Sequence, residues 1–478
     1  MSEFDTAERA VQAAMDAGAR YADARLMSRR HASMSARNGE VESVSENADM
    51  GIGVRALVGS GWGFFAVADL DDRAVRGAGA KAAEIAAASA LVSRQASALV
   101  KSTAVTATWA SECLIDPFSV PLSDKGDLLV RATRAMTEHG ADLAEAQCQS
   151  WETRKWFVSS EGHRIDQHIR EAGAGITATA IGDGETQCRS YPAARGQYGT
   201  QGWELVDAID LEAHAARVGS EARQLLSAPP CPSGETTLIL GGEQLALQIH
   251  ESVGHAIELD RILGWEAAYA GTSWLDLGQL GSLKFGSPLM NITIDPTIPG
   301  ALGSFGYDDE GTAAACRDAV RDGTWVGVLA GRDSAAVAGL DYAGSVRADG
   351  WARLPMVRMT NVGLEPGPHT FDEIVAATDD GIYMETNRSW SIDDRRLNFQ
   401  FGTEVAYEVK NGQLGRLLRN PTYTGIGPTF WSSLDMLSSE IVSWGTPNCG
   451  KGQPGQIGHT GHPAAPARFR NVRVGVRA

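Results

Sequence analysis

The stretch SAPPCPSGE, residues 227–235, separates two parts of the chain that differ in pattern. Its prolines and its glycine interrupt regular secondary structure, and they lie between a long segment of helical spacing and the apolar run TTLIL at residues 236–240. We therefore expect a linker here, with one domain over residues 1–227 and a second domain over residues 228–478.

The part before the linker mixes helices and strands. Apolar side chains recur at helical spacing in four segments, and strand-like runs occur in three others, the first of which turns at Gly59-Ser60-Gly61. The predicted helices cover residues 6–17, 72–91, 124–138 and 208–226, and the predicted strands cover residues 51–67, 151–159 and 175–181. This pattern indicates a mixed α/β domain.

The part after the linker consists mainly of short strand-like runs separated by Gly, Pro and Asn. Examples are residues 292–294 and 405–409, and an Asn411-Gly412 turn that leads into residues 414–418. One segment differs, because residues 243–259 have helix formers at most positions. The sequence thus predicts an α+β fold, in which an N-terminal mixed α/β domain precedes a mostly β C-terminal domain that carries one unusual helix.

The overall composition is that of a globular protein and limits the classes of partner. The chain has 478 residues, of which 43% are hydrophobic and 21% charged, and its formal net charge is -17. Because the charge is negative and no local basic patch is evident, we expect no binding to nucleic acid. No apolar run approaches the roughly 20 residues of a membrane span, and the first residues are acidic, so we expect a cytoplasmic protein without membrane contact.

The six cysteines are scattered along the chain. No C-x-x-C pair occurs among Cys113, Cys148, Cys188, Cys231, Cys316 and Cys449. A disulfide framework or a zinc ribbon is therefore not expected, and each cysteine is predicted to be a reduced thiol.

The helical segment contains a pair of histidines at an unusual spacing. In QIHESVGHAIELD, residues 248–260, His255 follows His250 by five positions, whereas the zinc-protease signature H-E-x-x-H uses four. At about 3.6 residues per turn, residues five apart lie about 140° apart around a regular helix, against about 40° for residues four apart. A widened turn of the π type absorbs one extra residue, and Gly254 tolerates unusual backbone angles. We therefore predict a distorted helix that presents both histidines to one metal ion.

A catalytic site of the zinc type needs a third protein ligand, an open position for water, and a carboxylate near that water. Our candidate ligand is Cys449, in GTPNCGKGQPGQ at residues 445–456, because its Gly, Asn and Lys neighbours suggest a tight, accessible loop rather than an apolar core. His459 and His462, a short way downstream in GHTGHPA, remain alternative ligands because imidazole is the commonest metal ligand.

Two carboxylates follow the second histidine. Glu258 and Asp260 could orient a ligand imidazole through hydrogen bonds from behind the metal ligands. They could equally be ordinary surface carboxylates, and the sequence leaves both interpretations open.

These residues together resemble the TldD/PmbA family of metalloproteases. The resemblance rests on HESVGHAIELD and NCGKGQPG, and it extends over nearly the whole chain. It includes RNGEVESVSENADMGIGVRALVGSGWGF at residues 37–64 and, further on, FGYDDEGT, VRMTNVGLEPG, DDGIYMETNRSW and ARFRNVRVG. Two positions depart from the family pattern: Leu259 stands where Gly is usual, and the cysteine is followed by GKGQPGQ rather than GKDGQ.

The resemblance implies a metal-dependent peptidase of the HExxxH type. His250, His255 and Cys449 would hold one divalent ion per chain, zinc or else iron, and Glu251 would act as general base. Substrates would be extended or unfolded peptides, including precursors of peptide natural products. TldD-like members carry the HExxxH motif and PmbA-like (TldE) members lack it, so this chain resembles the catalytic kind.

The resemblance also implies a partner. A TldD-like chain would pair with a PmbA/TldE-like subunit in a heterodimer, and a homodimer is the alternative. Two other functions are carried as competing hypotheses: a non-catalytic scaffold subunit of such a heterodimer, and a metal-dependent hydrolase or redox enzyme that acts on a peptide-derived small substrate.

Overall fold

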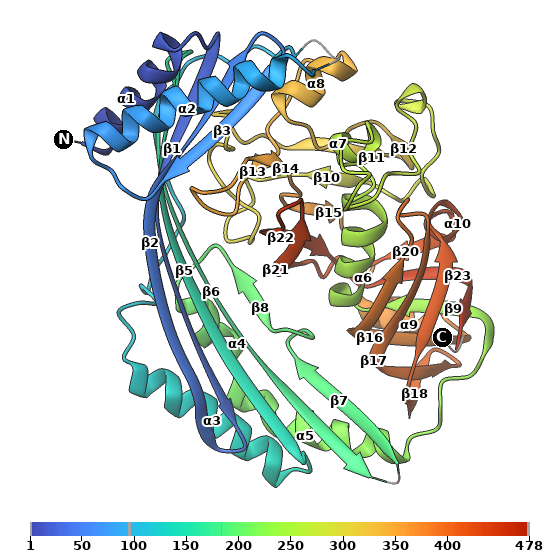
Figure 1. Cartoon of the computed structure of the whole chain (residues 1–478). Helices are drawn as coiled ribbons and strands as arrows, with labels where there is room; N and C mark the ends of the chain where they lie inside the picture. The colour runs from blue at the N-terminus through green and yellow to red at the C-terminus, as the bar shows by residue number, and fades with distance from the viewer. Residues whose placement is uncertain (1, 94–96, 183, 476–478) are drawn as a thin grey trace.

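The computed structural model describes residues 2–93, 97–182 and 184–475. The predicted α+β class is confirmed: the N-terminal half combines helices with a large sheet, and the C-terminal half is mostly β (Figure 1). The division into domains at residues 1–227 and 228–478 stays a prediction. No helix among the described residues has both the length and the apolar character that crossing a membrane requires.

A sheet of long, mostly antiparallel strands forms one side of the molecule (Figure 1). The strands have the order β3-β2-β1-β5-β6-β4, and β7 and β8 also pair with β6. The first two strands are joined at Asn38 and Gly39, which both have positive φ, as a tight hairpin turn requires. The bounds are β1 Tyr21–Arg37, β2 Glu40–Val58, β3 Gly61–Val67, β4 Thr106–Ala110, β5 Leu143–Ser159, β6 Arg164–Gly182, β7 Glu185–Tyr191 and β8 Gln197–Gly199.

The N-terminal helices lie at the two ends of this sheet (Figure 1). One pair is α1 (Glu3–Asp16) and α2 (Asp72–Ala90), and the other is α3 (Leu122–Glu138) and α5 (Leu211–Ser227). The segment predicted as one helix over residues 208–226 is divided between two helices, because α4 (Glu204–Ile209) ends at Asp210 and α5 begins after it. The backbone of Asp210 is left-handed, and its side chain caps the start of α5. Small alanines dominate both interfaces with the sheet, so the helices approach it closely.

The C-terminal half is built on a closed sheet. Its strands have the order β16-β9-β23-β19-β17-β18, and β16 also pairs with β17, while β20 pairs with β23. The bounds are β9 Gly234–Leu240, β16 Asp380–Ile392, β17 Asn398–Lys410, β18 Gln413–Leu418, β19 Thr422–Ile426, β20 Leu434–Leu437 and β23 Ala467–Val474. Helices α9 (Phe371–Ala376) and α10 (Gly427–Ser432) connect some of these strands.

Shorter elements lie between the two large sheets. A four-stranded sheet consists of β10 (Ile292–Ile294), β11 (Arg317–Arg321), β12 (Thr324–Trp325) and β15 (Val362–Leu364), and two hairpins pair β13 (Val346–Arg347) with β14 (Met356–Val357) and β21 (Val442–Lys451) with β22 (Gln456–Ala464). Helices α7 (Leu259–Ile262) and α8 (Arg332–Ala338) complete this region. The β21–β22 hairpin lies between the N-terminal sheet and helix α6 (Gly242–Ile249) (Figure 1).

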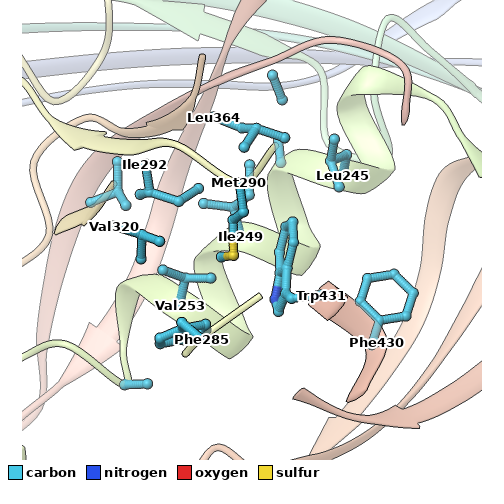
Figure 2. Packing of buried hydrophobic residues seen from close by; sticks show 14 of the residues in the cluster. Leu245, Ile249, Val253, Phe285, Met290, Ile292, Val320, Leu364, Phe430 and Trp431 are labelled. Atoms are coloured by element: carbon cyan, nitrogen blue, oxygen red, sulfur yellow. The ribbon is translucent and has the colours of Figure 1, made fainter. Parts of the chain in front are cut away.

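Helix α6 continues directly into a π-helical turn at His250–Gly254, and a hydrophobic core holds both in place. Leu245, Ile249 and Val253, which are spaced four residues apart, are fully buried among side chains that include Met290 and Trp431 (Figure 2). Because one face of the helix is fixed by this packing, its other face presents His250 and Glu251 in a defined orientation.

Candidate metal centre

The predicted widening of the helix is present at the two histidines. The backbone N–H of His255 donates to the carbonyl oxygen of His250 over 3.1 Å, which closes a turn of five residues. Gly254 serves a different purpose from the one expected, since its φ is not positive and a Cβ there would lie 2.1 Å from Sδ of Met359. Glycine here therefore lets the side chain of Met359 pack directly against the turn.

The structure brings the three predicted ligands together. One ligand atom each from His250, His255 and Cys449 lies within 4.8 Å of the others, and all three residues are buried. Sγ of Cys449 is 3.8 Å from Nε2 of His255. Two imidazoles and a thiol at this separation can coordinate one metal ion jointly.

The expectation that Cys449 lies on an accessible loop is wrong. Cys449 belongs to strand β21, pairs with Gly458 of β22, and is only 4% exposed. The strand bulges between Thr446 and Cys449, which redirects the following side chain. Burial raises the pKa of Cys449, but Arg358, whose guanidinium donates to the Cys449 carbonyl oxygen, and His255 outweigh it and lower this pKa below the usual thiol value. The thiolate that a metal needs is thereby favoured.

His462 orients His250. Nδ1 of His462 lies 2.9 Å from the carbonyl oxygen of Val362, which can only accept, so this nitrogen carries a proton. Burial and the neighbouring His250 keep the pKa of His462 well below its ordinary value, so the ring is neutral and its Nε2 accepts. Nδ1 of His250, 2.8 Å away, must then be the donor. This chain of hydrogen bonds leaves Nε2 of His250 with its lone pair free.

Glu258 orients the second histidine. Of the two interpretations of Glu258 and Asp260, the one that makes them surface carboxylates is wrong, because both residues are buried. Oε2 of Glu258 lies 3.0 Å from Nδ1 of His255 and accepts from Nε of Arg261 at 3.0 Å. Lys451 donates to both oxygens of Asp260 at 2.9 and 2.8 Å and lies 3.4 Å from Glu258. Burial opposes ionisation, but Lys451, His255 and Arg261 hold the pKa of Glu258 well below its usual value.

Glu251 lies beside the three candidate ligands and faces a cavity. Its Oε2 accepts a hydrogen bond from Nη1 of Arg396 at 2.7 Å. The cavity has a volume of about 320 Å³, and all of the candidate ligands line it together with Glu251 and Arg396. A metal ion held by these ligands would therefore have an open side for water or substrate.

His459 lies elsewhere. Its Nδ1 is 3.0 Å from both carboxylate oxygens of Glu171, and its ring packs edge-on against Trp151 at a centroid distance of 4.8 Å. Of the two alternative ligands that the sequence left open, His459 therefore does not lie beside His250 and His255.

The chemistry of the donor set fits a bound metal ion. Burial lowers the pKa of His250 and of His255, so both imidazoles are neutral, as metal ligation requires. The thiol of Cys449 is biased toward the thiolate, and Nδ1 of each imidazole is engaged by a neighbour, while Nε2 of His255 faces Sγ of Cys449. Partners behind the ligands that fix ring orientation in this way are typical of metal sites in proteins.

Sequence reasoning missed several residues around the site. Arg396 reaches Glu251 from the turn between β16 and β17. Lys451 was noted only as a neighbour of Cys449, although it neutralises the buried carboxylates. No spacing in the chain links these residues to the HExxxH segment, so only the folded structure could identify them.

The chain matches known proteins over most of its length. Models of PmbA/TldA metallopeptidase domain 1, the central domain and the C-terminal domain match residues 22–90, 115–226 and 233–475, respectively. A metalloprotease of Methanothermobacter thermautotrophicus is 30% identical over 95% of this chain and 95% of its own. A metalloprotease TldD homolog of Haemophilus influenzae is 27% identical over 93% of this chain and 91% of its own.

A solved structure has the same fold. TldE from Thermococcus kodakarensis superimposes with a TM-score of 0.70 at 15% identity, over 98% of this chain and 99% of its own. The three domain models and the full-length relatives confirm the resemblance carried by the HExxxH and cysteine segments. The chain belongs to the PmbA/TldD family of metallopeptidases.

Proposed function

We propose that this chain is a catalytic peptidase in which His250, His255 and Cys449 hold one divalent metal ion. Zinc is the ion that a His2Cys donor set suits best, and iron is also compatible with it. The observation that carries the proposal is the convergence of these three buried ligand atoms within 4.8 Å beside an open cavity.

Glu251 is the proposed general base. When bound, the metal ion would polarise the scissile carbonyl and lower the pKa of water. Glu251 would take a proton from that water and pass it to the leaving amine. Its hydrogen bond with Arg396 supports this role, because it fixes the carboxylate at the wall of the cavity that the candidate ligands also line.

The proposed substrate is an extended peptide. The cavity is lined by residues 444–450 of strand β21, which pairs only with β22 among the described strands. The side chain of Gln197 occupies the other edge at Ser443 and Gly445, which leaves residues 446–448 as the part of this edge that a peptide could reach. An edge strand beside a catalytic centre can hold a peptide by backbone hydrogen bonds, which favours unfolded substrates over folded ones.

A scaffold role in a heterodimer is the second candidate, and the likeness of fold to TldE is the observation that favours it. The presence of Glu251 together with all three candidate ligands favours the catalytic role instead. We propose that the catalytic chain works with a PmbA/TldE-like subunit, or with a second copy of itself, and a mass measurement of the complex tests this.

The decisive experiment replaces Glu251 with Gln. The Glu251→Gln variant should keep its metal and its fold but lose cleavage of unstructured peptides by ~10²–10⁴-fold, because the carboxamide cannot take a proton from water. Glu235→Gln, at an exposed position of β9, is the matched control and should cleave at the parental rate. Metal content is measured on every sample, and the partner subunit is present in each assay. Unchanged cleavage by metal-loaded Glu251→Gln would remove Glu251 as the base.

A further inference from the structure

A second cavity lies between the N-terminal sheet and the C-terminal half. Its volume is about 110 Å³, and among the described residues it has no lining residue in common with the cavity beside Cys449. The sheet contributes Met27, Trp151 and Ile169 to its wall, and residues 456–459 of strand β22 contribute as well. A ligand bound here would therefore contact both halves of the chain without occupying the candidate metal centre.

Two arginines of this cavity lie on one face of the β13–β14 hairpin. Val346 pairs with Val357, and because side chains alternate between the faces of a strand, the residues that follow them, Arg347 and Arg358, both lie on the other face. A Cβ on Gly458 would lie 2.5 Å from Nη2 of Arg358, so glycine leaves the room that this guanidinium needs. Both arginines line the cavity.

Several N–H donors of these guanidinium groups have no acceptor. Nη2 of Arg358 donates to the carbonyl oxygen of Cys449, and Nη2 of Arg347 donates to that of His459 at 2.6 Å. Nε and Nη1 of Arg358 and Nε of Arg347 are buried and have no hydrogen-bond partner among the described residues. Because Arg358 is only 2% exposed, unpaired donors there are costly, which indicates an acceptor from outside the chain.

The carboxylates that line the cavity are engaged by other groups. Their contacts are Glu171 with His459, Asp349 with Arg29, and Asp309 with Lys155 and Arg25. None of the described carboxylates forms an ion pair with Arg347 or Arg358. The two arginines are therefore the cations of this cavity that still lack an anionic partner.

The two arginines repel each other. Burial is the main reason that the pKa of Arg347 is lowered to about 10, and the charge of Arg358 lowers it further. Glu171 and Asp309 act in the opposite direction but do not offset these effects. A ligand with a negative charge would relieve the repulsion and stabilise both guanidinium groups.

We propose that Arg347 and Arg358 bind a small oxyanion, which is either a phosphate group or a carboxylate group. An oxyanion offers two or more acceptor oxygens, so it can engage unpaired N–H groups of both arginines at once. Trp151 and Phe305 line the same cavity, so the charges there are weakly screened. This inference is independent of the proposed peptidase function.

The test titrates the parent protein, in a buffer that contains chloride, with inorganic phosphate and separately with acetate. Calorimetry should show binding of at least one of them with a dissociation constant of about 1 mM or lower. Tighter binding of phosphate would identify a phosphate group as the ligand, and tighter binding of acetate would identify a carboxylate. The temperature of thermal unfolding should rise with the concentration of that anion, because it binds only where both halves are folded together.

Lysine variants test the two residues. Arg347→Lys and Arg358→Lys keep the positive charge but remove the Nε–H donor, so each should weaken binding of the anion by about tenfold or more. Arg73→Lys, at an exposed position of α2, is the matched control and should bind the anion as the parent does. Arg347→Lys is the more informative variant, because Arg358 also holds the strand of Cys449. Circular dichroism checks that each variant is folded.

Three outcomes would overturn the proposal. An anion bound to a metal ion at the candidate metal centre would bind Arg347→Lys as tightly as the parent, so equal affinities for the parent and folded Arg347→Lys would place the anion elsewhere. Absence of binding of both phosphate and acetate up to about 10 mM would show that no oxyanion site exists. Equally strong competition by chloride would rule out recognition of an oxyanion.

Discussion

His250 donates a hydrogen bond from Nδ1 to Nε2 of His462 over 2.8 Å, and this contact joins helix α6 to strand β22. Because the other nitrogen of His462 is fixed by the Val362 carbonyl, the direction of the hydrogen bond is determined. His462 therefore acts on the candidate metal site through the tautomer and orientation of His250.

The first prediction concerns His462. His462→Phe keeps a ring of similar size but removes the acceptor, so His250 can turn or change tautomer. We expect metal affinity to fall about 10–100-fold, as measured by competition with a chelator of known affinity. His459→Phe should leave the affinity unchanged, since His459 contacts Glu171 instead. Equal affinities for His462→Phe and the parent would show that the contact does not orient His250.

The second prediction concerns the ligands themselves. The parent, purified without a histidine tag, should contain about one metal ion per chain, and Cys449→Ala should lose most of it because one of three ligands is gone. Cys316→Ala removes an exposed thiol and should keep the metal. Elemental analysis measures both variants, and retention of metal by Cys449→Ala would refute its assignment as a ligand.

The third prediction concerns the buried cation behind the site. Lys451 is fully buried and neutralises Asp260 and Glu258. Lys451→Met should destabilise the fold by about 3–5 kcal/mol, because it leaves buried carboxylates without this partner. Urea unfolding followed by circular dichroism measures the loss. Lys81→Met, at an exposed position of α2, should change stability by less than about 0.5 kcal/mol.

The fourth prediction concerns a buried ion pair that joins the two halves of the chain. Asp309 contacts Arg25 at 3.2 Å and Lys155, both on the N-terminal sheet. Burial opposes ionisation, but Lys155 and Arg25 outweigh it and lower the pKa of Asp309. A carboxyl group with a lowered folded-state pKa stabilises the protein above its unfolded pKa of about 3.9, and this contribution is lost as the pH falls through the folded value.

Asp309→Asn tests this linkage. The variant should be less stable at neutral pH by about 3–5 kcal/mol, because two buried cations lose their shared partner. Its stability should also fall less steeply than that of the parent as the pH is lowered below about 4. Thermal unfolding at a series of pH values measures both effects, and parallel curves for the two proteins would contradict the assigned role of Asp309.

Much of the local structure could be predicted from the sequence. The five-residue spacing of His250 and His255 predicts a widened helical turn, since only such a turn brings both rings to one side of the helix. Turn residues predicted the β2–β3 hairpin, although strand β2 begins at Glu40 rather than near Gly51. The part of β2 before Gly51 pairs with β1 but not with β3, and it is exposed, so it lacks an alternating apolar face and periodicity does not reveal it.

The sequence by itself determined which residue types could serve as ligands and how the backbone around them would bend, because both depend on side-chain chemistry and on short-range spacing. Only the tertiary structure decided that Cys449 is buried in a strand and that His462 orients His250. These contacts join segments of the chain through the folding of the β21–β22 hairpin against helix α6. Burial and long-range pairing are properties of the packed core, and no local pattern encodes them.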